Sequence, residues 1–315
     1  MFAASVIICS HNPREDYLRR VLDALKAQAL PAKDWELLLV DNASKEPLAK
    51  RVDLSWHPHA RHICEDKVGL THARLRGIAE SKSDLLVFVD DDNVLRADYL
   101  QAALKISKDW PQLGAWGGSC LPEFEAEPCP EMRPWLAGLL IEKLSTQVWA
   151  RLRSFTEALP PGAGMTVRGA VAKRYRELVL RDPVRQALGR TGKKLAAGED
   201  SDMALCGFEV GLGTGRFPEL ELTHLIPARR VTLEYIEGLH EGFGYSDVVL
   251  KAIHHREALA QLQSGGLKNF LLPIVMTATG KSRVQKRIRL AEERGRTTAL
   301  RDLEASGYFN QPPRT

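Results

Sequence analysis

Three consecutive carboxylates, Asp90, Asp91 and Asp92, directly follow the apolar run Leu85-Leu86-Val87-Phe88-Val89. A run of this length that is rich in Val, Leu and Phe predicts a buried strand of a parallel sheet. The acids then fall at the carboxyl end of that strand, where open α/β sheets bind ligands. Adjacent carboxylates repel one another, and Mg²⁺ is usually held by one or two carboxylates together with substrate phosphates. The stretch therefore predicts a site for a divalent cation and a phosphate; the alternative is a solvated acidic turn.

Four more residues have side chains that could act with these acids. Asp41 follows a second predicted strand, residues 36–40, and His224 lies at the end of a short predicted strand. Glu199 and Asp200 follow Gly198 in the first turn of a predicted helix, where the helix dipole favours acids for structural reasons alone. The chemical alternative makes one of these two acids a general base at the mouth of a cleft. A lone strand histidine is more often structural than a ligand.

The elements that must position these residues alternate between strand and helix. Strands are expected at 5–9, 36–40 and 85–89, and a helix is expected from residue 13, with Asn12 as N-cap and Pro13 in the first turn. A further helix opens at 68–74 and carries Arg74 near the ligand-binding edge, where its guanidinium reaches a phosphate or a base, or is simply a surface cation. This alternation predicts a doubly wound α/β sheet.

Two other stretches draw attention without matching a specific motif. His57, His59 and His62 lie in a polar loop, but no acid or cysteine shares their spacing, so a solvated loop is favoured over a metal site. Gly162 and Gly164 follow two prolines and would let the backbone approach a ligand closely.

The composition is that of a soluble globular protein, with 44% apolar and 27% charged residues. No apolar run approaches the roughly 20 residues of a membrane span. The first residues lack a basic segment and lead directly into a predicted strand, so no signal peptide is expected. Five cysteines without a CxxC pair favour a reduced, cytoplasmic protein without a cysteine zinc site.

Positive charge is concentrated near the C-terminus. Residues 251–301 contain eleven Lys or Arg and three Asp or Glu, a local charge of +8 in a chain whose net charge is +4. An apolar stripe at 267–275 followed by cations at 281–289 predicts a helix on an anionic membrane surface, or a helix packed on the main domain with a solvated basic face. Few aromatic residues interleave with the cations, so nucleic acid is not expected as a partner. If the membrane contact holds, a second basic patch could meet a phosphate of a lipid-linked molecule: Arg190, Lys193 and Lys194.

In this order, the motifs resemble those of an inverting family 2 glycosyltransferase with the GT-A fold, over about residues 4–230. Residues 5–12 are similar to the family's first strand and nucleotide loop, 36–44 to its second strand, 69–74 to its glycine-to-arginine helix start, 89–92 to its DxD signature and 198–200 to its "ED" motif. The resemblance implies that Asp200 is the catalytic base, with Glu199 beside it, and that Asp92 and His224 bind the metal. It implies nucleotide contacts from a further set: Ser10, Asn12, Asp41, Arg74, Asp90 and Asp91.

The resemblance also implies partners and cofactors. The donor would be a nucleotide diphosphate sugar, with UDP the preferred nucleotide, and the cation Mn²⁺ or Mg²⁺. The acceptor would be a glycan or a lipid-linked molecule in surface polysaccharide or glycolipid synthesis. Residues 1–230 would form the GT-A domain and 231–315 a basic helical extension of a cytoplasmic protein, peripheral at the inner face of the membrane. His11 and Leu75 replace the family's usual tyrosine and asparagine, which leaves the choice of base open.

Other readings of the same residues remain. A nucleotidyltransferase of similar fold usually has a Gly-, Arg- and Lys-rich loop after the first strand, where this chain has Ser10-His11-Asn12-Pro13. A two-metal phosphohydrolase needs more acids and histidines than these motifs supply. A non-catalytic nucleotide-sugar-binding protein would keep the pocket and lose the base. No residue pattern identifies the donor sugar, the acceptor, the linkage or the oligomeric state.

Overall fold

The computed structural model describes residues 2–154, 156–190, 196–255 and 282–310. The chain forms two compact units. The first comprises Met1–Glu125, Leu139–Arg181 and Asp200–Ile226, and the second comprises Ala126–Gly138, Asp182–Glu199 and Pro227–Thr315. The second unit thus takes in two segments from the first 230 residues, and the domain boundary at residue 230 stays a prediction.

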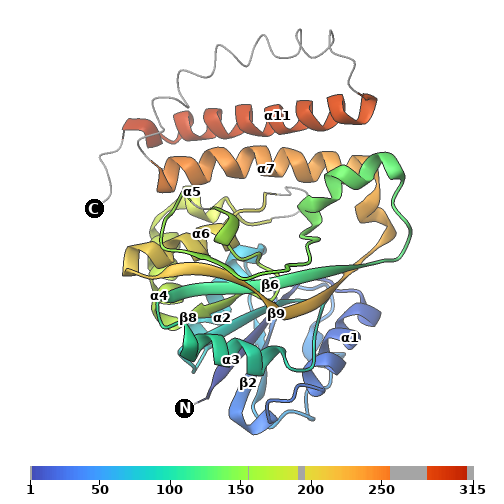
Figure 1. Cartoon of the computed structure of the whole chain (residues 1–315), viewed down its shortest axis with the longest axis vertical. Coiled ribbons are helices and arrows are strands. Elements are labelled where there is room, and N and C mark those ends of the chain that lie inside the picture. Colours follow the sequence, from blue (N-terminus) through green and yellow to red (C-terminus); the bar gives the residue numbers. More distant parts are fainter. Residues whose placement is uncertain (1, 155, 191–195, 256–281, 311–315) are drawn as a thin grey trace. The chain divides into compact units, whose positions relative to one another are not determined.

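One mixed sheet of nine strands forms the centre of the first unit (Figure 1). The strands are β1 (Ala4–Ser10), β2 (Trp35–Asp41), β3 (Ala60–Cys64), β4 (Leu85–Asp90), β5 (Asn93–Leu95), β6 (Leu113–Phe124), β7 (Val148–Ala150), β8 (Thr166–Arg168) and β9 (Gly213–Ile226). Their order is β3-β2-β1-β4-β8-β6-β9-β5, and β7 also pairs with β9. Strands β3, β2, β1 and β4 are parallel, as are β6 and β9. The expected α/β class is confirmed.

Helices cover both faces of this sheet because the central strands are apolar on both sides. Along β1, Val6 and Ile8 pack with helices α1 (Glu15–Lys26) and α3 (Tyr99–Asp109). Ile7 points to the opposite face, which is covered by α2 (Leu70–Glu80), α4 (Gly169–Arg181) and the part of α6 (Glu199–Leu205) that belongs to this unit. The strands predicted at 5–9, 36–40 and 85–89 are therefore confirmed, each within one residue of the observed ends.

The start of α1 differs from the prediction. The helix begins at Glu15 with Arg14 at the N-cap position, not with Asn12. Asn12 instead has a φ of 50° and uses its side-chain oxygen to accept a hydrogen bond from the Lys45 N–H at 2.9 Å. The predicted capping role was wrong because a loop 30 residues away in the sequence competes for the same side chain.

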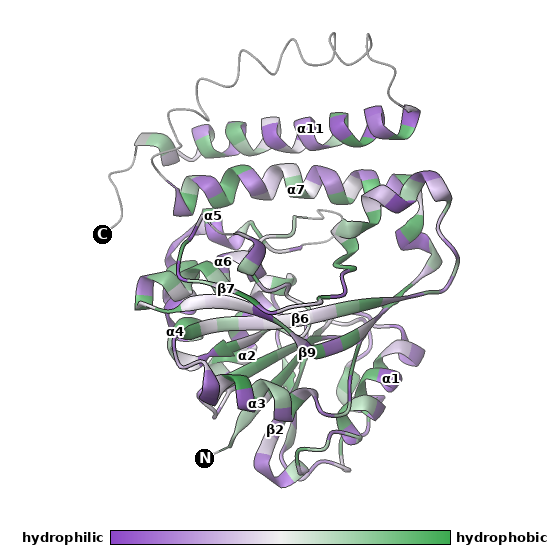
Figure 2. Ribbon diagram, in the orientation of Figure 1, coloured by the Kyte–Doolittle hydropathy of each residue, from purple (hydrophilic) through white to green (hydrophobic). Residues whose placement is uncertain are grey.

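The second unit is helical. Its α-helices among the described residues include α5 (Pro183–Gln186), α7 (Leu233–His254) and α11 (Arg283–Ala305). Ion pairs join α7 and α11 in the same order along both helices, Glu237 with Arg287 and Glu241 with Arg294, so α7 and α11 lie side by side and run parallel (Figure 1). Hydrophilic residues predominate along α11 (Figure 2). None of the described helices combines the length and apolar content of a membrane span.

Several sequence predictions fall outside the described residues. These are the apolar stripe at 267–275, Lys281 of the cationic cluster, and Lys193 and Lys194 of the second basic patch.

The histidine loop is not wholly solvated, as the sequence suggested. His59 and His62 are exposed, but His57 is 3% exposed, and its ring lies edge-on to the buried Trp35 with centroids 4.2 Å apart. The His57 Nδ1 accepts a hydrogen bond from the His59 N–H at 3.1 Å. Burial lowers the pKa of His57 from its ordinary value near 6.5 to about 4. A neutral imidazole packed against Trp35 is thus part of the core, because the charged form would lose its hydration there.

His57 should therefore make the first unit less stable in mild acid. Between pH 6.5 and about 4 the unfolded chain binds a proton at this residue and the folded chain does not, so the free energy of unfolding falls as the pH falls. The slope from one histidine reaches at most ~1.4 kcal/mol per pH unit. Urea unfolding at pH 4.5, 5.5, 6.5 and 7.5 should show a smaller slope for His57→Asn. His62→Gln, at an exposed position, is the control, and equal slopes for all three proteins would contradict the prediction.

Candidate active site

The carboxyl ends of three parallel strands bring predicted site residues to one edge of the sheet. In the strand register Ser10 of β1 is paired with Asp41 of β2, and Cys9 is paired with Asp90 of β4. Because parallel strands end at the same edge, residues from three separate sequence motifs become neighbours. Asp91 and Asp92 follow β4 in the turn that leads to β5.

The three consecutive acids turn to three different partners. The Asp90 Oδ1 lies 3.8 Å from the Arg74 Nη2, and the Ser10 hydroxyl donates a hydrogen bond to Asp91. The Asp92 Oδ2 lies 3.4 Å from the His224 Nε2. The mutual repulsion expected from the sequence is thus relieved by contacts from α2, β1 and β9. The partners also give the three carboxylates different chemical surroundings.

Backbone pairing fixes the Asp92–His224 contact. Strand β5 pairs antiparallel with β9, and the Leu225 N–H donates to the Asp92 carbonyl oxygen at 2.8 Å. The His224 Nδ1 lies 3.0 Å from the Leu139 carbonyl oxygen; a carbonyl only accepts, so Nδ1 carries the proton. In a neutral ring Nε2 then has a lone pair, which faces the Asp92 carboxylate. Two acceptors in this position need a cation or a second proton between them.

The Asp92–His224 pair fits a divalent cation by chemistry and by separation. Two atoms that bind one ion at ~2.1 Å, with ~90–110° between them, lie about 3.0–3.5 Å apart, which includes the observed 3.4 Å. Carboxylate oxygen suits Mg²⁺ and Mn²⁺, and one imidazole favours the transition metal. Within the described part of the chain, no group of three or more His, Cys, Asp or Glu residues is arranged to hold a metal. Among the described residues, Asp92 and His224 would bind such an ion, and water and substrate can complete its coordination.

Arg74 and Asp200 meet at Gly162. The Gly162 N–H donates to the Asp200 Oδ2 at 2.8 Å, and the Ser201 N–H donates to its Oδ1 at 2.7 Å. A Cβ atom at residue 162 would lie 2.8 Å from the Asp200 Oδ2 and 2.9 Å from the Arg74 Nη2. Arg74 is 3% exposed and also approaches Asp90. The guanidinium therefore lies between the acid end of β4 and the carboxylate that the sequence suggests as the base, and Gly162 leaves the room for both.

Glu199 has surroundings different from those of Asp200. Its side chain is 4% exposed and its Oε2 accepts a hydrogen bond from the Gly198 N–H at 3.2 Å. Glu199 belongs to the second unit and Asp200 to the first. The hydrogen bond from the Gly162 N–H goes to Asp200.

Asp41 and Asn12 build the loops beside Ser10. The two Asp41 carboxylate oxygens accept hydrogen bonds from the Ser44 N–H at 3.0 Å and the Leu48 N–H at 2.8 Å. The Asn12 N–H donates to the Ser44 hydroxyl at 3.0 Å. Asn12 and Ala43 both have φ near +50°, a region that non-glycine residues rarely adopt and that concentrates at functional sites. The nucleotide contacts expected of Ser10, Asn12 and Asp41 stay predictions. The side chains of Asn12 and Asp41 do fix the loops that follow β1 and β2.

Asn42 is a residue whose role sequence reasoning missed. It is 3% exposed, and its Nδ2 donates to the Glu65 carbonyl at 3.0 Å and the Lys67 carbonyl at 2.8 Å. Its Oδ1 accepts from the Gly69 N–H at 2.8 Å, so one side chain ties the end of β2 to the segment that starts α2. At the level of sequence it was included only within residues 36–44, and its neighbour Asp41 was the only signal. Through α2, Asn42 contributes to the placement of Arg74.

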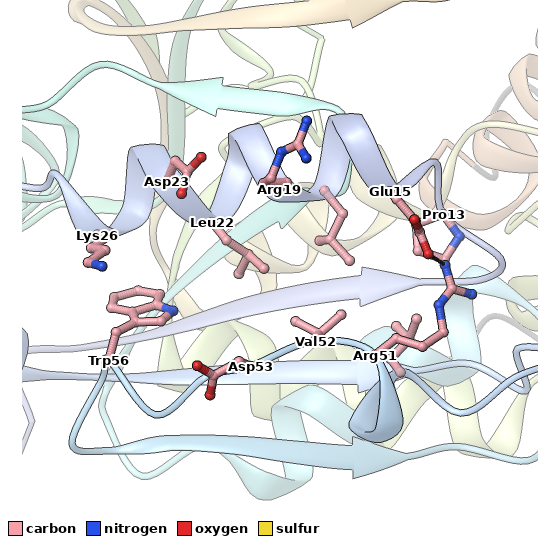
Figure 3. A pocket seen from close by; sticks show the side chains of 12 residues that line it. Pro13, Glu15, Arg19, Leu22, Asp23, Lys26, Arg51, Val52, Asp53 and Trp56 are labelled. Atoms are coloured by element: carbon pink, nitrogen blue, oxygen red, sulfur yellow. Dashed lines mark hydrogen bonds and ion pairs between the residues drawn. The ribbon is translucent and has the colours of Figure 1, made fainter.

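A separate groove of about 310 Å³ lies between α1 and residues 48–56 (Figure 3). Its apolar lining comes from Leu18, Leu22, Leu48, Val52 and Trp56, and charged side chains surround it. In Figure 3 the Trp56 indole lies at one end of this groove and Arg51 with Glu15 at the other. None of the residues predicted as site residues lines it.

Comparison with known proteins agrees with this arrangement of strands and acids. Residues 5–121 match the model of the family described as "Glycosyl transferase family 2". The resemblance to family 2 is confirmed. The matched segment contains Ser10, Asp41, Arg74 and the three acids Asp90–Asp92 at the end of β4, and it ends before Asp200 and His224. No curated protein matches the sequence significantly.

Solved structures with a similar fold include S. aureus TarS 1-349 in two complexes. The complex with UDP is 14% identical, covers 100% of this chain and 93% of the TarS 1-349 chain, and has a TM-score of 0.52. The complex with UDP-GlcNAc is 13% identical, covers 97% and 92%, and has a TM-score of 0.53. At this identity the likeness concerns the fold, and it confirms the GT-A-like architecture expected from the sequence.

Gly162→Ala should separate Asp200 from Arg74. The φ of Gly162 is not in the left-handed region, so alanine is allowed by the backbone, but its methyl group would occupy the space that the two side chains share. Because displacing a catalytic group by ~1 Å can cost about 100-fold in rate, we expect kcat for donor turnover to fall by about that factor with little change in Tm. Gly207→Ala, where the added Cβ would meet nothing closer than 3.6 Å, is the matched control. Equal kcat values for the two variants would refute this role for Gly162.

Proposed function

We propose that the protein is a metal-dependent glycosyltransferase that moves a sugar from a nucleotide diphosphate sugar to an acceptor hydroxyl with inversion. The observation that carries the proposal is the convergence, at the carboxyl edge of the sheet, of the acids after β4 with Arg74, Asp200 and His224. Support also comes from the family 2 match over residues 5–121 and from TarS, a protein of similar fold crystallised with UDP and with UDP-GlcNAc. UDP is accordingly the proposed nucleotide.

Each side chain has a task in such a reaction. Cleaving the sugar–phosphate bond leaves a nucleoside diphosphate with additional negative charge, and a Mn²⁺ or Mg²⁺ ion held by Asp92 and His224 would neutralise that charge. The oxygen of the acceptor hydroxyl bonds to the sugar carbon from the side opposite the leaving phosphate. Asp200 takes the proton of that hydroxyl at the same time. The N–H groups of Gly162 and Ser201 hold the Asp200 carboxylate in a fixed orientation while it accepts that proton. A base positioned in this way contributes ~10²–10⁴-fold to the rate.

The buried Arg74 completes the charge arrangement. Its guanidinium lies near Asp90 and, at Gly162, near Asp200, and it presents a fixed positive charge to a diphosphate. Ser10 and Asp91 are hydrogen-bonded to each other and bring a hydroxyl and a carboxylate to the same edge, which suits contact with a ribose or a metal-bound water.

Incubation with UDP- and GDP-sugars and Mn²⁺ tests the proposed function. We expect slow hydrolysis of one donor in the absence of acceptor, and its loss when EDTA removes the cation. Asp200→Asn should bind that donor with a nearly unchanged Kd and lose ~10²–10⁴-fold in turnover, because only the base is removed. Gly207→Ala serves as the fully active control.

The other outcomes of this assay identify the rival functions. Donor binding without turnover by the unmodified chain would indicate a nucleotide-sugar-binding protein. In a parallel incubation with a nucleoside triphosphate and a sugar phosphate, release of pyrophosphate would indicate a nucleotidyltransferase. An equal loss of donor affinity and turnover in Asp200→Asn would show that Asp200 is not the base.

The proposed acceptor is a glycan or a lipid-linked molecule at an anionic membrane surface, in surface polysaccharide or glycolipid synthesis. The first turns of α11 support this, since residues 282–291 contain four cations and no acid. Arg287 pairs with Glu237, whereas Arg283, Lys286 and Arg289 form no ion pair with any described residue. Leu290, which directly follows Arg289, is 37% exposed. Each Lys or Arg near an anionic membrane contributes ~1 kcal/mol to binding.

Co-sedimentation with vesicles of phosphatidylcholine that contain about 30% phosphatidylserine tests whether the first turns of α11 bind an anionic membrane. We expect binding at low salt that is weakened about tenfold or more when Arg283, Lys286 and Arg289 are all replaced by Gln. Replacement of three exposed cations of the first unit by Gln is the charge-matched control: Arg19, Lys105 and Lys108. Absence of binding by the unmodified chain, or equal weakening in both triple variants, would remove α11 as the membrane contact.

A further inference from the structure

Asn93 lies directly beside the Asp92–His224 pair because of the strand register. It is the first residue of β5 and is paired with His224 of β9 in an antiparallel ladder. Side chains of directly opposed residues in such a ladder project from the same face of the sheet. The two residues, 131 positions apart in the sequence, are therefore neighbours on one face by the geometry of the backbone.

The Asn93 side chain fixes the direction of the Asp92 carboxylate. Its Nδ2 donates a hydrogen bond to the Asp92 Oδ1 at 3.0 Å, while the other oxygen, Oδ2, lies 3.4 Å from the His224 Nε2. A carboxylate is planar and rigid, so holding one oxygen fixes where the other points. Asn93 is 1% exposed, and its packing leaves little freedom for the amide to turn away.

The fold itself gives no reason for asparagine at this position. Asparagine is disfavoured in strands, where a β-branched or aliphatic residue would fit better. The Asn93 Oδ1 is buried and has no hydrogen-bond partner among the described residues. A buried carbonyl in that state costs about 1–3 kcal/mol, so this side chain carries a stability cost rather than a benefit. Its one hydrogen bond among the described side chains goes to Asp92, which is where its use must lie.

We propose that Asn93 is a positioning residue that orients Asp92 for the divalent cation and thereby sets the affinity of the site for the metal. The inference rests on the proposed function, since it assumes that Asp92 and His224 hold the ion. Groups that hydrogen-bond to metal ligands in this way typically change metal affinity 10–100-fold when they are removed. The carbonyl oxygen of Asn93, on the same face as His224, adds an acceptor for a water of the hydrated ion.

Mn²⁺ titration of the purified chain, with the free ion followed by its paramagnetic resonance signal and no nucleotide present, tests this role. Asn93→Leu keeps the approximate shape and removes the donor, and we expect Mn²⁺ affinity to fall at least tenfold. The Tm of the metal-free variant should be unchanged or higher, because the unsatisfied carbonyl is gone. Asn93→Ala is a second variant that avoids steric overlap, should the leucine not be accommodated.

Thr166→Val is the matched control. The Thr166 hydroxyl is also fully buried and without a partner among the described residues, but it lies in β8, and the Asp92–His224 pair involves β5 and β9. Its Mn²⁺ affinity should equal that of the unmodified chain. In an Asp92→Asn background the effect of Asn93→Ala on Mn²⁺ affinity should vanish, because Asn93 acts through that carboxylate; a merely structural role would leave the effect in place.

The outcomes separate this inference from the proposed function. Mn²⁺ binding by the unmodified chain with unchanged affinity in both Asn93 variants would overturn the role of Asn93 alone. Absence of Mn²⁺ binding by the unmodified chain, both alone and with UDP added, would overturn the metal site itself, and with it the inference. A tenfold loss that persists in the Asp92→Asn background would also reject the positioning role.

Discussion

The electrostatics of three adjacent carboxylates constrain everything around them. Asp90, Asp91 and Asp92 leave the end of an apolar strand together, and burying them without positive or donating partners would cost several kcal/mol. The chain supplies a guanidinium from α2, a hydroxyl from β1 and an imidazole from β9. Each of these comes from a different part of the sequence, so the acids are tolerated only once the sheet has assembled.

Of these three partners, the imidazole of His224 is the most distant in sequence from the acids. His224 lies in β9, which runs parallel to β6 with a register shift between Gly118 and Ser119. A Cβ atom at Gly118 would lie 1.9 Å from the Leu220 carbonyl oxygen, so only glycine permits the two strands to approach at this shift. Beyond the shift, Pro122 is paired with His224, and on the other side of β9 Asn93 is paired with the same residue. The placement of one possible metal ligand thus depends on a glycine more than one hundred residues away.

The sequence predicted the elements that depend on residues close together in the chain. Strands β1, β2 and β4 were evident from apolar runs because burial on both faces needs continuous hydrophobicity, and the acids at their ends followed from parallel topology. The prediction was wrong where a distant group competes for a side chain: the Lys45 N–H binds Asn12, and Trp35 takes His57 into the core. The meeting of Arg74 and Asp200 at Gly162 could not be derived from spacing, since it brings together α2, a loop and α6. Family resemblance suggested the residues but not the contact.

The carboxylate of Asp41 can hold the loop after β2 and also contact a nucleobase. Two of its lone pairs accept the Ser44 and Leu48 N–H groups, which hold the loop after β2 against the Asn12 loop. A carboxylate has about four acceptor positions, so about two remain for a donor on a nucleobase. The Ser44 and Leu48 N–H groups fix the plane of the Asp41 carboxylate before a ligand binds. A donor group of the ligand therefore binds a carboxylate whose rotation is already restricted. The contact predicted for Asp41 is therefore compatible with its role in the loop, and the loop is what would make that contact specific in direction.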